Sequence, residues 1–197
     1  MSVVNVVEGK IKTQTTDKIV PYANSRDVNV SNPSILFDSG NNGWVVGMNV
    51  QWTGTSWAND AVGGEEGFGV YLYNVTGVPS QLAVQSTYAA LYDEDLNNVH
   101  YSFSRFPGSP SCGYGYRAQD QLVIGWPNYK YVGANIYASA RYNNAFGLCS
   151  GVAQAFYDHT FANCGISSAS ITPSGPNVTF SSTSGHFSVA SDNDVIF

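Results

Sequence analysis

The sequence predicts an all-β fold: an antiparallel β-sandwich or β-barrel with long polar loops and little or no helix. Short stretches alternate apolar and polar residues with the period of two that puts every second side chain of a strand on one face. Clusters of Gly, Pro and Asn, which form tight turns, separate nearly all of these stretches. Charged residues make up only 11% of the chain, so that the good helix formers Lys, Glu and Arg are scarce.

The clearest strand is GWVVGMNVQW at residues 43–52, in which Trp44, Met48 and Trp52 share one apolar face. Such alternation favours antiparallel strands over buried parallel ones. The other predicted strands are residues 68–72, 82–92, 99–103, 121–126, 129–138, 152–157, 166–171, 178–181 and 186–190. The predicted turns are residues 39–43, 62–67, 76–80, 107–115 and 172–177. The run GVAQAF within residues 142–157 is the one stretch that also fits a short helix.

We expect residues 1–197 to form a single domain, because the chain shows neither a fixed-period repeat nor a linker that would divide two domains. A core of this size is stable without a metal ion or disulfide bonds. Strand-like sequence at both ends, at residues 2–7 and 194–197, suggests that the domain belongs to a longer protein.

The charge balance argues against two classes of partner. Lys and Arg total 8 against 14 Asp and Glu, and the resulting net charge of -6 repels a phosphate backbone, so nucleic-acid binding is not expected. No stretch approaches the twenty or so apolar residues that span a bilayer, and residues 1–12 lack the pattern of a signal peptide. Membrane insertion is therefore not expected either.

The chain has three cysteines, Cys112, Cys149 and Cys164, whose spacing fits neither a CxxC metal site nor a disulfide-rich scaffold. Two interpretations stay open. All three are reduced thiols in a cytosolic or virion protein, or Cys149 and Cys164 pair in an oxidising compartment.

Candidate catalytic and metal-binding residues are few. Ser150, Cys149, Asp158 and His159 come nearest to a nucleophilic triad, but no GxSxG elbow accompanies them. Two acidic groups, Asp93 to Asp95 and the pair Asp192 and Asp194, do not match a calcium-binding loop. We therefore predict no catalytic residue, no metal site and no cofactor.

Glycoside hydrolysis is an alternative, because jelly-roll xylanases have this size and are rich in Tyr, Trp, Gly and Asn. That chemistry needs two carboxylates that face each other across a cleft. The nearest candidates, Glu65 and Glu66, lie between Gly64 and Gly67 in what the sequence suggests is a turn.

The strongest compositional signal is aromatic residues interleaved with Gly, Asn and Ser in the segments QWTGTSWAND, CGYGYRAQD and WPNYKY. Tyr and Trp provide large, stiff contact area at small entropic cost and dominate recognition surfaces. The alternative is that half of these rings face the core. The predicted contact residues for a ligand or receptor are Trp57, Tyr114, Tyr116, Arg117, Asp120, Tyr129 and Tyr131.

In overall character, seen in GFGVYLYNVTG at residues 67–77 and DQLVIGWPNYKYVGANIY at residues 120–137, the chain resembles the projecting capsid spike of small non-enveloped viruses, in particular astroviruses. The resemblance implies a β-barrel core with surrounding sheets, a homodimer, and a location on the virion surface. It also implies attachment to a host-cell receptor protein or glycan, and recognition by neutralising antibodies. No residue role is carried over from it.

The leading hypothesis is therefore a receptor-binding spike domain that performs no chemistry. The alternatives are a microbial or fungal carbohydrate-binding lectin and a jelly-roll glycoside hydrolase.

Overall fold

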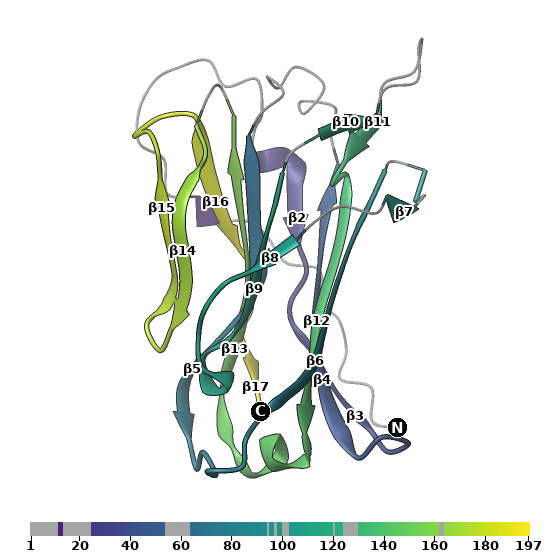
Figure 1. Cartoon of the computed structure of the whole chain (residues 1–197), viewed down its shortest axis with the longest axis vertical. Helices are drawn as coiled ribbons and strands as arrows, with labels where there is room; N and C mark the ends of the chain where they lie inside the picture. The colour runs from purple at the N-terminus through teal and green to yellow at the C-terminus, as the bar shows by residue number, and fades with distance from the viewer. Residues whose placement is uncertain are drawn as a thin grey trace.

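The structure, a computed structural model, describes residues 12–13, 25–53, 64–93, 95–96, 98–99, 103–119, 121–123, 130–161 and 164–197 (Figure 1). The described strands pair antiparallel throughout. The helices in these ranges are short 3-10 turns, η1 (Ser25–Asp27), η3 (Pro110–Cys112) and η4 (Asn144–Leu148). Within the described part, no helix is long and apolar enough to cross a membrane. The predicted all-β class is confirmed, as a sandwich of open sheets.

Two large sheets make up the sandwich. Sheet A has the order β1 (Lys12–Thr13), β16 (His186–Ala190), β13 (Ser150–Thr160), β5 (Glu65–Thr76), β9 (Gly113–Gln119) and β8 (Phe103–Arg105), and β17 (Val195–Ile196) also pairs with β13. Sheet B has the order β2 (Val28–Val30), β4 (Gly43–Trp52), β12 (Asn135–Asn143), β6 (Val84–Tyr92) and β7 (Asn98–Val99), and β3 (Ser34–Asp38) also pairs with β4. Two separate hairpins are formed by β10 (Gln121–Val123) with β11 (Lys130–Val132), and by β14 (Ile166–Thr172) with β15 (Gly175–Phe180).

The main core lies between the inner faces of sheets A and B. Large rings from sheet A, among them Tyr114 and Tyr157, meet the small side chains Ala138 and Ala140 of sheet B in one cluster of buried residues. Pairing large side chains with small ones lets the two layers interdigitate at the density of a protein interior. The alternation predicted for residues 43–52 is observed, since Val46, Met48, Val50 and Trp52 of β4 are buried in this core.

A third layer covers the outer face of sheet A. Figure 1 shows the hairpin β14–β15 on the left, sheet A in the middle and sheet B on the right. Beneath the hairpin, Gly69 of β5 lies opposite Gly115 of β9. A Cβ atom on Gly115 would lie 2.6 Å from the ring of Phe106 and 3.1 Å from that of Phe156. These glycines therefore let a second small core, with Ile171 of β14, pack directly on the sheet backbone.

This third layer explains where the predicted turns were wrong. Residues 62–67 and 107–115 were predicted as turns from their Gly and Pro residues. Residues 107–112 do form a loop that contains η3, but β5 already begins at Glu65 and β9 at Gly113. The glycines of these strands make room for the hairpin instead of making turns. GVAQAF lies in β13, so the helical alternative for it is wrong as well. The predicted strands 82–92, 166–171 and 186–190 correspond to β6, β14 and β16, whereas residues 101, 124–126 and 129 lie outside the described residues.

The three cysteines are free thiols and are buried. The structure therefore has no bond between Cys149 and Cys164. Burial raises the pKa of the Cys149 thiol, which keeps it in the protonated, unreactive form.

Candidate functional site

Two of the predicted contact residues are core residues. Tyr114 and Tyr116 are only 1% and 5% exposed, respectively. Their hydroxyls cross the sandwich and donate to the carbonyl oxygens of Ala138 (3.0 Å) and Ser139 (3.3 Å). The alternation GYGYR turns the glycines toward the hairpin and the tyrosines toward sheet B. The prediction that these rings contact a partner is corrected accordingly, because neither ring reaches the surface.

Arg117 lies on the outer face of sheet A, where its Nε donates to Glu65 Oε1 at 2.7 Å. The other carboxylate oxygen of Glu65 accepts the backbone N–H of Ile166 at 2.7 Å. Arg117 and Glu65 thus help to hold the start of β14 against sheet A. Trp57, Asp120 and Tyr129 lie outside the described residues, as does the side chain of Tyr131, whose backbone is part of β11.

The residues nearest to a triad are not brought together. Ser150 is the first residue of the 11-residue strand β13 and Cys149 directly precedes it, whereas Asp158 and His159 lie near the end of the strand. Asp158 and His159 also point to opposite sides of sheet A, because neighbouring residues of a strand alternate. Asp158 lies opposite Gly67 and His159 opposite Glu66.

A buried polar cluster, which the sequence did not reveal, closes one end of the main core. Tyr157 donates to Glu66 Oε1 at 2.9 Å and accepts from Trp52 Nε1 at 3.2 Å. Nδ1 of His159 lies 3.7 Å from the same Glu66 oxygen, and both side chains are fully buried. The cluster links β4, β5 and β13, and its burial separates it from any large substrate.

The two glutamates of the hydrolase alternative do not form a facing pair. Glu66 points into the main core and Glu65 points toward the hairpin, because they are neighbours in β5. A glycosidase needs both carboxyl groups on the two sides of one scissile bond. Among the described residues, no group of three or more His, Cys, Asp or Glu side chains could hold a metal ion.

Among the described residues, the outer face of sheet B carries three tyrosines, and we call it the tyrosine face. Its rings are Tyr88 and Tyr92 of β6 and Tyr137 of β12. The strand register brings them together, since Ser139 lies opposite Tyr88 and Ala90 lies opposite Tyr137. The face also includes Gly47, Asn49 and Gln51 of β4 and Asn135 of β12.

The tyrosine rings lie over small residues of the same face. Ala90 and Ser139 alternate with core residues and so point outward, yet they are only 3% and 8% exposed. A Cβ atom on Gly47 would lie 3.4 Å from the hydroxyl of Tyr137, which therefore crosses over β4. The rings of Tyr88 and Tyr137 are 5.9 Å apart, and Tyr88 is 49% exposed. The result is a layer of phenol rings spread across the sheet.

Polar interactions fix this layer. The side chains of Tyr88 and Tyr92 are hydrogen-bonded to each other. This hydrogen bond and burial both raise the pKa of Tyr92.

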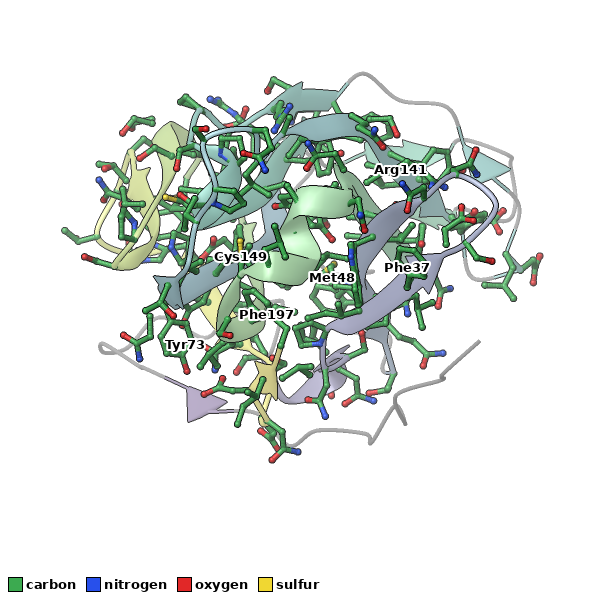
Figure 2. The ribbon with its side chains drawn as sticks, turned by 90° about the horizontal axis from the view of Figure 1, so that it is seen from below. Phe37, Met48, Tyr73, Arg141, Cys149 and Phe197 are labelled. Carbon is green, nitrogen blue, oxygen red and sulfur yellow. The ribbon has the colours of Figure 1, made fainter. Side chains whose placement is uncertain are left out.

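An ion pair lies at one end of the face, where Arg141 Nη1 is 2.8 Å from Asp38 Oδ2. Hydrogen bonds from Asn41 and Arg141 lower the pKa of Asp38 to about 2, so this pair stays ionised at physiological pH. Figure 2 shows Arg141 on the side of the molecule that faces away from the hairpin.

The tyrosine face was missed for a clear reason. Tyr88 and Tyr92 are four residues apart in a predicted strand, and this spacing alone puts them on the same face. However, the segment VQSTYAALY lacks the polar and apolar contrast that would tell the inner face from the outer one. Sequence reasoning therefore placed recognition in the loops.

Comparisons with known proteins show no family. No protein-family model matches the chain, and no curated protein matches its sequence. A similar solved structure is described as "pH-induced modulation of Streptococcus parasanguinis adhesion by Fap1 fimbriae". It is 11% identical, with a TM-score of 0.38 over 94% of this chain and 89% of that chain. A similarity at this level carries no argument about function, and the resemblance to a capsid spike stays a prediction.

Proposed function

We propose that this chain is an attachment domain that binds a receptor on a cell surface through the tyrosine face and performs no chemistry. The observation that carries the proposal is the layer of Tyr88, Tyr92 and Tyr137 over the small outward residues of sheet B. Exposed tyrosines that already rest on a rigid sheet lose little conformational freedom on binding.

The composition of the face supports the same function. It combines tyrosines with Gly, Ser and Asn, the residue types that antibody binding loops use most. Tyr is also among the residues that contribute most to binding energy at protein interfaces. In an attachment domain, a sheet with such a face serves as the contact surface without any catalytic group.

In its more specific form the proposal is a capsid spike domain on the virion surface, a homodimer that binds a host-cell protein or glycan and is recognised by neutralising antibodies. This form rests on the resemblance in sequence character alone. A microbial or fungal lectin would use the tyrosine face in the same way.

The test compares binding of the fluorescently labelled domain to a panel of animal epithelial cells. The double variant Tyr88→Ala with Tyr137→Ala removes the two rings in contact. The matched control is Tyr73→Ala, because Tyr73 stacks on Tyr71 and donates to Asp194 on the outer face of sheet A. Figure 2 shows Tyr73 and Arg141 on opposite sides of the molecule.

Removing Tyr88, which is exposed, and Tyr137, which is partly buried, should weaken attachment about a hundredfold, from roughly 1.4 kcal/mol for each ring. The control should bind like the wild type, and circular dichroism should give similar unfolding temperatures for all three proteins. Equal binding of the double variant and the wild type would show that attachment, if any, uses another surface. Failure of the wild type to bind any cell type would refute the proposed function itself.

A further inference from the structure

We infer that the ligand of the tyrosine face is a neutral oligosaccharide. This inference rests on the proposed function and adds the chemical class of the receptor. The shape of the face, its hydrogen-bonding groups and its charge each support it.

The shape of the face favours a sugar over a protein partner. Protein hot spots insert into well-packed pockets near the centre of an interface. On the tyrosine face, Tyr137 and Ser34 lie over Gly47, and Ala90 and Ser139, which pair with Tyr137 and Tyr88, are buried. A pyranose ring has a flat face of C–H groups, and such a face stacks on an exposed aromatic ring without needing a pocket.

The hydrogen-bonding groups match those of a sugar. A sugar hydroxyl both donates and accepts, and so does each phenol hydroxyl and each carboxamide. Asn49 and Gln51 are exposed on β4, and Tyr88 and Tyr92 on β6 are hydrogen-bonded to each other. The rings between them can stack on the apolar side of a sugar while the groups at the edge bind its hydroxyls.

The charge of the face favours a neutral ligand. Among the described residues of this face, the charged side chains are Arg141 and Asp38, and they are paired with each other. Arg141 is thus engaged by an internal carboxylate, whereas recognition of a sialic acid or a sulfate needs a cation that is free to pair with it. The net charge of -6 adds a general repulsion of anionic glycans.

The test is a panel of immobilised glycans that contains galactose-, N-acetylglucosamine-, fucose- and mannose-terminated oligosaccharides, each beside its sialylated or sulfated counterpart. We expect the wild type and Tyr73→Ala to bind at least one neutral member more than tenfold better than its charged counterpart. The Tyr88→Ala, Tyr137→Ala double variant should lose this signal at least tenfold while its unfolding temperature stays that of the control. We also expect the binding to change little between low and high salt, because no ion pair forms with the ligand.

Binding only to charged members, or to no member of the panel, would overturn the inference. The two proposals fail separately. If attachment to cells depends on Tyr88 and Tyr137 while the panel stays blank, the proposed function stands and the receptor is a protein. If a neutral glycan binds equally to the wild type and the double variant, the tyrosine face is not its site and the inference is wrong.

Discussion

Asp158 makes the stability of the domain depend on pH. Its side chain lies between sheet A and the hairpin, opposite Gly67, and is only 5% exposed. Burial raises its pKa from 3.8 to about 7, partly offset by a hydrogen bond from Ser188. Its Oδ2 accepts no hydrogen bond from the described residues. Glu65 and Arg117, which lie on the same outer face, are paired with each other.

The sign and size of the effect follow from this shift. Because the pKa of the folded state lies above that of the unfolded state, the unfolded state loses its proton first as the pH rises. Stability therefore falls between about pH 4 and pH 7 and levels off above that. A difference of about 3 pKa units at 1.36 kcal/mol each corresponds to roughly 4 kcal/mol. Asp158→Asn, which is uncharged, should remove this loss.

Urea unfolding of the wild type and Asp158→Asn at pH values from 4 to 8 measures the effect. The variant should gain up to about 4 kcal/mol over the wild type at pH 8 and little at pH 4. Asp38→Asn is the control, because Asp38 has a lowered pKa and is only partly buried, and it should leave this pH dependence in place. If Asp158→Asn loses stability with pH as steeply as the wild type, the carboxyl group of Asp158 is not the cause.

Two further substitutions test the packing. Tyr157→Phe removes the hydroxyl that donates to Glu66 and accepts from Trp52. Urea unfolding should show a loss of about 1–3 kcal/mol in the free energy of unfolding. A smaller loss would mean that another group replaces the hydroxyl. Gly115→Ala places a Cβ atom 2.6 Å from the ring of Phe106 and should lower the free energy of unfolding by about 1–3 kcal/mol. Faster hydrogen exchange in residues 166–180 would show that the hairpin packs less tightly on sheet A.

The sequence predicted the strands well where one face is buried and the other is exposed to solvent. Residues 43–52 correspond to β4 and residues 186–190 to β16, because alternation marks such strands directly. It failed at Glu66 and Gly115, which lie in sheet A. The part of sheet A formed by β5 and β9 is covered on both faces, so its outer positions carry glycines that resemble those of turns. A glycine in a turn and a glycine in a covered strand look alike in the sequence. Only the position of the hairpin, which depends on contacts between distant segments, distinguishes them.

The outer faces of the two sheets use small residues in the same way but with different outcomes. On sheet A, Gly67 and Gly115 make room for side chains of the hairpin and its neighbours, and the face becomes interior. On sheet B, Gly47 makes room for Tyr137 of the same sheet, and Tyr88, whose ring lies beside that of Tyr137, is 49% exposed. The glycines of sheet A therefore serve packing against the hairpin, whereas the tyrosines of sheet B form the surface for which we propose recognition.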